Sequence, residues 1–496
     1  MGHANYTENP IEEKTAGYGC GDVPAPGELV GQSRIETEWP LSFAQQRLWF
    51  LDQLEPGKAA YNMPLVARLR GALDLWALQR AVDAIVRRHE SLRTRFVAVN
   101  GRPAQIVDDD CRLRVRVDDL SALTGSEREV ECKGRVRDEI NRPFNPAEAP
   151  LTRVLLLRLA EKEHILVLTM HHIISDEWSL NIFVRELGAF YEGFATGEPV
   201  ELPELPIQYA DFAVWQHDWL KGEVLEEQLG FWREHLKGNP PTIELATDFP
   251  RRQSIESNGQ TLTRFLSKEL ETSLRALAKR EEATLFMVLL AAFNALLYRY
   301  TGQEDIVVSS PMAGRNRVEL EGLIGFFVNI LPLRTNLSGN PSFAALLRQV
   351  REVTLEGCAH QDAPFDYIVK ELHPERAASH TPFARVIFMS QNSSFERMQW
   401  HSGKQEAGTV HNGSPGALLE IQFLDAHNAS SKFELALNVQ ETTLGLAVHA
   451  EYNTGLFAES TVERLLQHFE NLLEGILANP AQQLSELPIL SDAEKK

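Results

Sequence analysis

Two adjacent histidines, His171 and His172, are followed at short spacing by Asp176 and Ser179, in the segment Met170-His-His-Ile-Ile-Ser-Asp-Glu-Trp-Ser179. A neutral imidazole can accept a proton or a hydrogen bond during a reaction, an effect typically worth about 10²- to 10⁴-fold in rate. The residue types therefore favour chemistry that is centred on this segment.

The elements on either side predict where these side chains lie. The run His164–Met170 is apolar and rich in branched residues, which predicts a strand that ends at the histidines. Downstream, apolar residues recur at helical spacing: Leu180, Phe183, Leu187, Phe190, Tyr191 and Phe194. The segment is therefore a strand-to-helix turn, where the strand fixes the side chains and the helix N-terminus offers amide donors and a positive dipole end.

The pattern H-H-x-x-x-D-x-x-S resembles the core motif of the condensation domains of nonribosomal peptide synthetases, in the superfamily of chloramphenicol acetyltransferase. Further segments resemble the ordered motifs of that family and cover almost all of the chain beyond residue 38. They are Leu41–Leu51, Arg88–Phe96, Tyr209–Trp215, Ile324–Asn329, His360–Phe365 and a degenerate last motif from Arg376 to Phe383.

The resemblance implies an α/β fold with two acyltransferase-like lobes in a V-shaped pseudodimer and an active site in a tunnel between them. A chain of 496 residues also exceeds what one core usually supports. We therefore expect a flexible leader at 1–38, an N-terminal lobe at 39–212, a C-terminal lobe at 213–486 and the start of a linker at 487–496.

The resemblance also implies a reaction: an acceptor aminoacyl amine attacks a donor acyl or peptidyl thioester, and both substrates are carried on phosphopantetheine arms. His172 is carried over as the catalytic residue, either as a general base or as a positioning group. His171 is expected to be more structural. Asp176 is expected to hold the loop by pairing with an arginine, for which we choose Arg315.

Four further residues are assigned to the site or its support. Ser179 is expected to be the N-cap of the following helix. Trp178 and Asn329 are expected to support the tunnel. Glu177 stands where the family usually has glycine, so its carboxylate could narrow the acceptor channel, attract a cationic nucleophile or turn to solvent.

Several alternatives remain open at this stage. The opening motif is similar to the subtype that joins an L-donor to an L-acceptor, but Glu177 leaves room for unusual donors, ester formation or a soluble acceptor. A freestanding enzyme and a noncatalytic recruitment domain are also considered. A metal site is disfavoured, because adjacent residues of an extended segment point to opposite sides and no third ligand has a familiar spacing.

Composition narrows the class of protein. A formal charge of −20 opposes binding to nucleic acid, and no apolar run approaches the length of a membrane span. The first twenty residues also lack a basic start followed by an apolar block, so we expect cytoplasmic residence. The cysteines Cys20, Cys111, Cys132 and Cys358 form no C-x-x-C pair, so we expect free thiols. We expect a monomer that binds no cofactor and whose partners are donor and acceptor peptidyl carrier proteins and an adjacent adenylation domain.

Periodicity predicts several other elements. Residues Leu75 to Val86 are expected to be a helix and Leu92 to Val99 a strand, while Leu151–Leu159 and Ile165–Met170 are expected to form a hairpin. A helix from about Glu269, an apolar helix through Leu297 and a strand at Asp305–Ser310 follow. The final helix, which includes Val462 to Ile476, is expected to open with Ser460 and Glu463 as a capping box.

Overall fold

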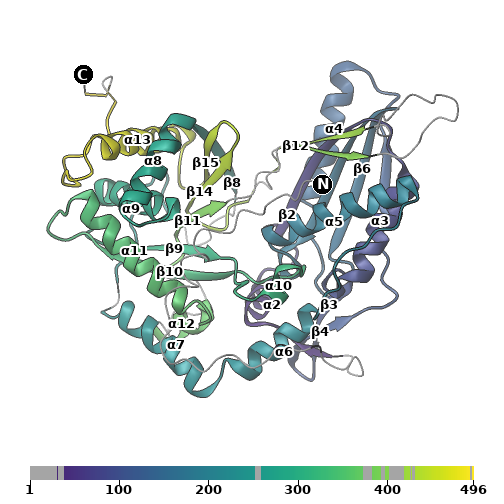
Figure 1. Ribbon diagram of the computed structural model, residues 1–496, viewed down its shortest axis with the longest axis horizontal. Helices are drawn as coiled ribbons and strands as arrows, with labels where there is room; N and C mark the ends of the chain where they lie inside the picture. Colours follow the sequence, from purple (N-terminus) through teal and green to yellow (C-terminus); the bar gives the residue numbers. More distant parts are fainter. Residues whose placement is uncertain are drawn as a thin grey trace.

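The computed structural model describes residues 38–238, 240–251, 258–372, 383–391, 397–401, 418–424 and 430–491, together with Leu29, Gly31, Ala426, Glu494 and Lys495. Two α/β lobes form a V, as predicted, and the chain passes between them through α6 (Tyr209–Trp219) and α7 (Gly222–His235) at its base (Figure 1). Cys20, nearly all of the predicted leader and most of the motif from Arg376 to Phe383 lie outside the described residues.

The N-terminal lobe is built on a sheet with the strand order β12-β13-β2-β7-β6-β5. Alternate residues of each strand face opposite sides, so the central strands β2, β6 and β7 bury one set against α3 and α5 and the other against α4. The bounds are β2 (Asn62–Arg70), β5 (Val115–Asp119), β6 (Thr152–Ala160), β7 (Glu163–His171), β12 (Arg397–His401), β13 (Leu418–Leu424), α3 (Leu75–Arg88), α4 (Gly125–Ile140) and α5 (Glu177–Thr196).

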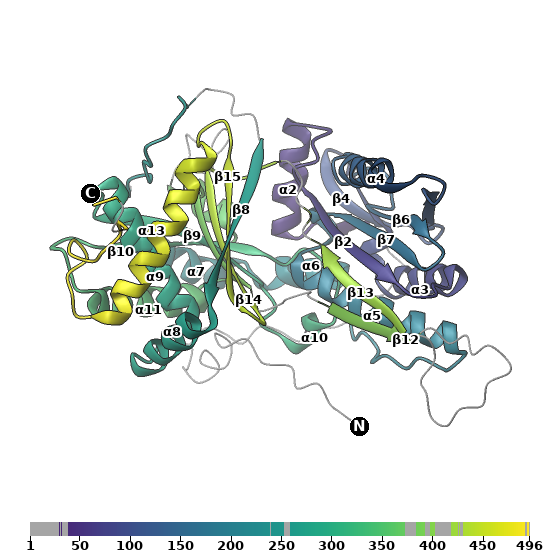
Figure 2. The same cartoon turned by 90° about the horizontal axis from the view of Figure 1, so that it is seen from above.

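The C-terminal lobe repeats this architecture with a sheet of order β10-β9-β11-β14-β15-β8. Its helices α8, α9, α11 and α13 pack on the side of the sheet that points away from the other lobe (Figure 2). The bounds are β8 (Gly259–Ser267), β9 (Asp305–Met312), β10 (Asn329–Asn336), β11 (Val386–Gln391), β14 (Leu435–Thr442), β15 (Gly445–Asn453), α8 (Lys268–Arg280), α9 (Leu285–Thr301), α11 (Phe343–Ala359) and α13 (Glu459–Ala478).

Smaller elements fill the base of the V. A short sheet of order β1-β4-β3 lies beside α2 and α6 in the N-terminal half, and α10 and α12 belong to the C-terminal half (Figure 1). Their bounds are β1 (Trp39–Pro40), β3 (Thr94–Val99), β4 (Arg102–Val107), α2 (Phe43–Leu54), α10 (Val318–Glu321) and α12 (Phe365–Leu372).

One segment crosses from the C-terminal half of the sequence to the N-terminal lobe. Strands β12 and β13 come from the range that we assigned to the C-terminal lobe, but β13 pairs antiparallel with β2 at the edge of the N-terminal sheet. Trp400 of β12 packs against Tyr191 of α5, with ring centroids 5.7 Å apart. The range 213–486 did not anticipate this crossing, which links the lobes at a second place.

Most predicted elements are confirmed. β6 and β7 form the expected antiparallel hairpin, and α3, α8, α9 and β9 lie where periodicity placed them. The predicted capping box of the last helix is wrong. α13 begins at Glu459 after Ala458, whose amide donates to Asp248 Oδ2 at 2.8 Å, so a side chain from a distant segment takes the acceptor role that was predicted for Glu463.

The final residues pack on the C-terminal lobe. Leu487 is buried in the core of that lobe, and Arg299 of α9 donates a hydrogen bond to its carbonyl at 2.7 Å. Within the described residues no single helix is long and apolar enough to span a bilayer; α8 and α9 reach that length only as a pair bent by 101°.

Candidate active site at the lobe junction

Backbone hydrogen bonds fix the position of the histidine turn. β7 ends at His171, a short 3₁₀ helix η2 (His172–Ile174) follows, and α5 begins at Glu177. The amide of His171 donates to the carbonyl of Leu151 at 2.9 Å, and the amide of His172 donates to the carbonyl of Tyr61 at 2.8 Å. The predicted strand-to-helix turn is therefore confirmed, with one extra helical turn between the two elements.

His171 is a buried residue. Its side chain is 2% exposed and lies near the rings of Tyr61 and Phe144, with centroid distances of 6.3 Å and 6.1 Å. Its Nδ1 accepts a hydrogen bond from the amide of Ile173 at 3.1 Å. Burial lowers the pKa of His171 from its ordinary value to about 3, because a charged imidazole would lose its hydration there.

His172 is only half-buried, and its hydrogen bond defines its tautomer. Nδ1 lies 2.7 Å from the carbonyl oxygen of Ser175. A carbonyl only accepts, so Nδ1 carries the proton and Nε2 has the lone pair that can accept from a substrate. Burial first, and then the cation of Lys432, lower the pKa of His172 to about 3. The imidazole is therefore neutral at physiological pH.

Asp176 points away from this chemistry and caps α5. Its carboxylate accepts from the amide of Ser179 at 2.8 Å and from the amide of Phe327 at 3.2 Å. It also accepts from Nη2 of Arg315, at 3.1 Å to Oδ1 and 3.3 Å to Oδ2. The partner that we chose from the sequence is thus the one that the structure pairs with Asp176. A carboxylate with this many donors has little capacity left for proton transfer.

Arg315 brings the C-terminal lobe to the turn. It lies in the loop after β9, is 3% exposed, and donates to the carbonyls of Leu320 and Leu323 at 2.5 Å and 2.7 Å. Its guanidinium lies over the ring of Phe327 at 4.1 Å from the centroid. Separation of the lobes at this point would leave one buried charge without its partner, which is costly in free energy. The Asp176–Arg315 pair therefore fixes the two lobes against each other.

The expectation that Ser179 is the N-cap of α5 is wrong. Asp176 takes that position because it precedes the helix by one residue, whereas Ser179 is the third residue of the helix. The hydroxyl of Ser179 lies 2.6 Å from the Asp176 carboxylate and accepts from the amide of Gly325 at 3.0 Å and from Arg315 at 2.9 Å. Ser179 therefore joins the same junction as a hydrogen-bonding residue.

Gly325 has to be glycine for this junction to close. A Cβ atom at that position would lie 1.9 Å from the ring of Tyr209, which is buried, so this ring would have to move. Tyr209 in turn donates to the carbonyl of Phe326 and lies 2.8 Å from the hydroxyl of Ser42. These residues come from three of the motifs recognised in the sequence, and the structure brings them together.

Glu177 and Trp178 make two further contacts with the C-terminal lobe. The carboxylate of Glu177 accepts a hydrogen bond from Nε2 of Gln391 in β11, and Oε1 of Gln391 accepts from Asn438 in β14 at 2.8 Å. The indole of Trp178 donates to the carbonyl of Glu321 at 2.9 Å. Four consecutive residues at the start of α5 therefore contact the other lobe.

Asn329 lies in a different set of contacts. Its amide nitrogen donates to the carbonyls of Gln361 and Ala363 at 2.8 Å and 2.7 Å, and its oxygen accepts from the amide of Phe365 at 3.1 Å. It fixes the loop before α12. We expected it to support the tunnel, and these bonds assign it to loop geometry within the C-terminal half.

Sequence reasoning missed two residues that the structure brings to the turn. Lys432 is a cation that lowers the pKa of His172, and Gln391 is the partner of Glu177. Both lie more than 200 positions downstream of the motif, and neither belongs to a segment that we identified. No local signal in the sequence connects them with the histidines.

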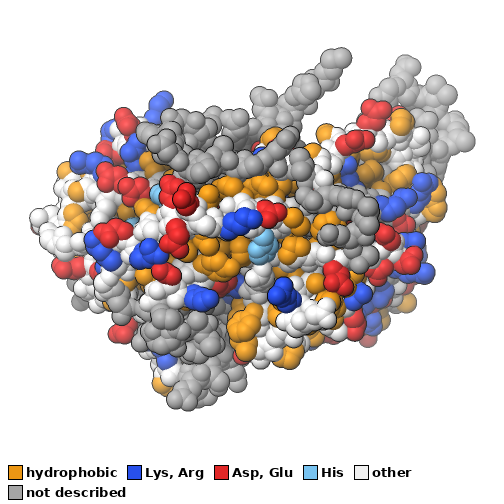
Figure 3. Space-filling model, turned by 90° about the horizontal axis from the view of Figure 1, so that it is seen from below, with side chains coloured by type: hydrophobic (Ala, Val, Ile, Leu, Met, Phe, Trp, Pro, Cys, Tyr) orange, Lys and Arg blue, Asp and Glu red, His pale blue; other side chains and the backbone are white. Residues whose placement is uncertain are grey.

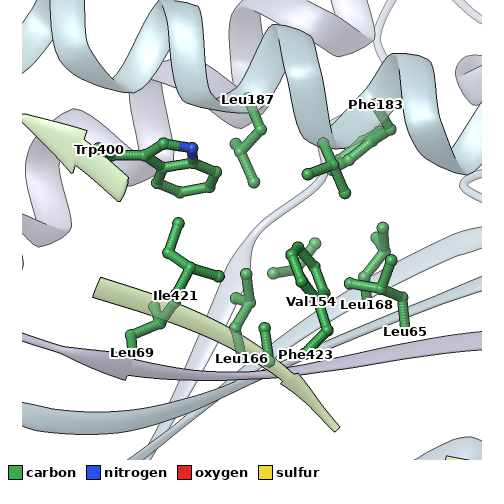
Figure 4. Close-up of a pocket in the computed structure, with 12 residues that line it drawn as sticks. Leu65, Leu69, Val154, Leu166, Leu168, Phe183, Leu187, Trp400, Ile421 and Phe423 are labelled. Atoms are coloured by element: carbon green, nitrogen blue, oxygen red, sulfur yellow. The ribbon is translucent and has the colours of Figure 1, made fainter. Parts of the chain in front are cut away.

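An enclosed apolar pocket in the N-terminal lobe is separate from this site. It lies between α5, Trp400 and the sheet, and Figure 4 shows its lining of leucine, valine, phenylalanine and isoleucine side chains. Its volume is about 10 Å³, which is barely enough for one water molecule. It is a packing defect of the core and has no room for a substrate.

The view from below shows the base of the V, with apolar side chains near its centre and a histidine and several charged side chains among them (Figure 3).

Comparisons with known proteins agree on one family. The sequence profile of the condensation domain matches residues 35–496. One of the linear gramicidin synthase proteins of Brevibacillus parabrevis is 46% identical over 475 residues, which cover 96% of this chain and 9% of that protein. The chain thus spans about a tenth of the length of this relative.

Solved structures show the same fold. The X-domain in its complex with OxyB from teicoplanin biosynthesis matches with a TM-score of 0.79 and 26% identity, over 94% of this chain and 98% of that one. The first condensation domain of the calcium-dependent antibiotic synthetase matches with a TM-score of 0.74 and 22% identity, over 92% and 100%. The chain belongs to the condensation domain family of nonribosomal peptide synthetases.

Proposed function

We propose that the chain catalyses amide bond formation between two substrates carried on the phosphopantetheine arms of a donor and an acceptor carrier protein. The observation that carries this proposal is the state of His172: a neutral, half-buried imidazole whose Nδ1 is fixed by the carbonyl of Ser175, so that Nε2 is ready to accept. The imidazole stands at the junction of the lobes, where two substrates can meet from opposite faces.

The reaction needs little activation beyond this arrangement. The acceptor amine attacks the carbonyl carbon of the donor thioester, the C–N bond forms and the carbonyl electrons move to oxygen. Collapse of that intermediate breaks the C–S bond. The amine gives up one proton, which passes through Nε2 of His172 to the departing thiolate.

The low pKa of His172 favours a particular role. An imidazole with a pKa of about 3 holds a proton only briefly, so it serves best as a hydrogen-bond acceptor that orients the amine. Free α-amines titrate near pH 8, so a sufficient fraction is already deprotonated at neutral pH. Holding the two substrates together then supplies much of the acceleration.

Glu177 bears on the choice of substrate. Its carboxylate accepts from Gln391, so we infer that it narrows the passage between the lobes as a fixed polar group. The opening motif supports a subtype that joins an L-donor to an L-acceptor. Synthetic acceptors of increasing size, compared in wild type and Glu177→Gly, test this inference: the variant should accept larger substrates if Glu177 forms a wall.

The partners follow from the same proposal. The linear gramicidin synthase relative is far longer than this chain, which supports carrier proteins and an adjacent adenylation domain as partners. We propose that the chain works as a monomer in the cytoplasm and itself binds no cofactor.

Intact-mass analysis tests the function. Donor and acceptor carriers are loaded with aminoacyl groups, and the condensed product is sought on the acceptor carrier with wild type and with His172→Ala. Product with wild type and its loss with the variant are expected. Undiminished product with His172→Ala would remove the catalytic assignment, and product without an acceptor carrier would favour a soluble acceptor.

A recruitment domain is the second candidate, and one observation favours it. The X-domain that shares this fold is found in a complex with OxyB. Under this alternative the chain would dock a partner enzyme and form no bond. Turnover in the loaded-carrier experiment would exclude it.

A further inference from the structure

Lys432 is a cation of the C-terminal lobe that reaches the histidine turn of the N-terminal lobe. It lies in the segment just before β14, and its ammonium is 5.4 Å from the centre of the Tyr61 ring. Attraction between an ammonium and the face of an aromatic ring holds such a contact in place. Lys432 thus adds a contact between the C-terminal lobe and Tyr61 of the N-terminal lobe.

Tyr61 connects this cation to the histidines. The carbonyl of Tyr61 accepts from the amide of His172 at 2.8 Å, and its ring lies 6.3 Å from the ring of His171. The backbone of Lys432 is itself fixed, because its amide donates to Glu451 of β15 at 3.4 Å. The position of the ammonium is therefore set by both lobes.

The charges that face the two imidazoles are positive. Lys432 and Arg47 of α2 both lower the pKa of His172, and Lys432 and Arg153 of β6 both lower that of His171, as does His172 itself. The side chain of Lys432 is exposed, yet the protein around it desolvates the ammonium enough to lower its pKa, against the opposing effect of Glu451. A cation that solvent can reach, and that is partly surrounded by protein, could contact a substrate bound beside it.

A cation that is held beside the histidine turn suits one step of the proposed reaction. Attack of the amine on the thioester places negative charge on the carbonyl oxygen, and fixed donors that face this oxygen lower the barrier. A nearby positive charge also disfavours protonation of His172, which keeps Nε2 ready to accept.

We propose that Lys432 is a further residue of the active site, whose ammonium stabilises the oxygen of the tetrahedral intermediate while Tyr61 holds the ammonium in place. This inference rests on the proposed function. In the step, the C–N bond forms, the carbonyl electrons move to the oxygen that faces Lys432, and they return as the C–S bond breaks. Lys432 exchanges no proton and is unchanged at the end.

The test compares Lys432→Met and Lys432→Arg with wild type by single-turnover kinetics on loaded carriers between pH 5 and pH 9. Met keeps the length of the side chain and removes the charge, whereas Arg keeps the charge. Lys221→Met, which removes an exposed lysine paired with Asp218, is the matched control. Loss of one donor to such an oxygen typically lowers the rate by about 10²- to 10³-fold.

We expect that loss with Lys432→Met, substantial recovery with Lys432→Arg and no change with Lys221→Met. A Lys432→Met rate within threefold of wild type at every pH would overturn the inference and leave the function standing. Equal losses in the Met and Arg variants would also overturn it, because an effect that does not depend on the charge assigns Lys432 a structural role. No product from wild type would overturn the function itself and this inference with it.

Discussion

The two sides of the histidine turn differ in how deeply their side chains are buried and in how many protein groups they bond to. On one side, Asp176, Ser179 and Arg315 are buried and hydrogen-bonded to one another and to the backbone of the C-terminal lobe. On the other side, His172 is half-buried and bonds through one ring nitrogen to Ser175, while the side chain of Lys432 is exposed. The closed side therefore joins the lobes, and under the proposed function the open side is the part that meets substrates.

The largest expected effect of a substitution is on the open side. His172→Ala should lower the single-turnover rate by about 10²- to 10⁴-fold, because the amine loses its hydrogen-bond acceptor. The melting temperature should change little, since the ring is half-buried and its hydrogen bond to Ser175 stays within one short turn. Rapid-quench kinetics and differential scanning fluorimetry check both values. A large loss of stability with a proportionate loss of rate would instead place His172 on the closed side.

The closed side should show the opposite behaviour. Asp176→Ala leaves the guanidinium of Arg315 buried without its partner, which typically costs about 3–5 kcal/mol. Asp176→Asn keeps an oxygen that can cap α5 and should cost less. Urea unfolding of the three proteins measures this series. If Asp176→Ala were as stable as wild type, the ion pair would not be what joins the lobes.

The low pKa of His171 makes us expect that the stability of the protein depends on pH. Its pKa is about 3 in the folded protein and near 6.5 when unfolded, so between these values the unfolded chain binds a proton that the folded chain does not. Stability from this group is therefore lost as the pH falls through that window, by up to about 1.4 kcal/mol per pH unit. His171→Asn keeps an acceptor for the amide of Ile173 and should have a shallower loss between pH 7 and pH 5. Equal slopes for both proteins in urea unfolding would contradict this.

The smallest expected effect concerns the contact of Glu177 with Gln391. A hydrogen bond of this kind contributes about 0.5–1.5 kcal/mol when its groups are partly exposed. A double-mutant cycle of Glu177→Ala and Gln391→Ala should show a coupling energy in that range, while Glu177→Gln should retain part of it. Additive effects of the two substitutions would show that the carboxylate does not act through Gln391.

The parts of the site that sequence could predict are those with local patterns. The apolar run before His171 and the helical spacing after Ser179 define β7 and α5 without reference to the rest of the chain. The pairing of Asp176 with Arg315 came from the family resemblance, since 139 positions separate the two residues. Local spacing therefore predicts the secondary structure elements, and the family resemblance predicts pairs of residues that are distant in the sequence.

The errors and omissions have physical causes. Asp176 and Ser179 are both good N-cap residues, and only the point at which the backbone turns helical decides between them. Asp248 replaces the expected cap of α13 because the fold brings it there. The partners of the open side, Lys432 and Gln391, arrive from the other lobe through long-range packing, which leaves no mark on the spacing of the motif.

The contrast between the open and the closed side of the turn can be tested most directly by chemical modification of the two histidines. Diethyl pyrocarbonate acylates neutral imidazoles that solvent can reach, and fragmentation of the peptide that contains both residues locates the label. We expect that His172 is labelled with a parallel loss of condensation activity, that loaded carriers slow its labelling, and that His171 stays unlabelled in the folded protein. Protection of His172 to the same degree as His171 would contradict the claim that its imidazole faces the passage between the lobes.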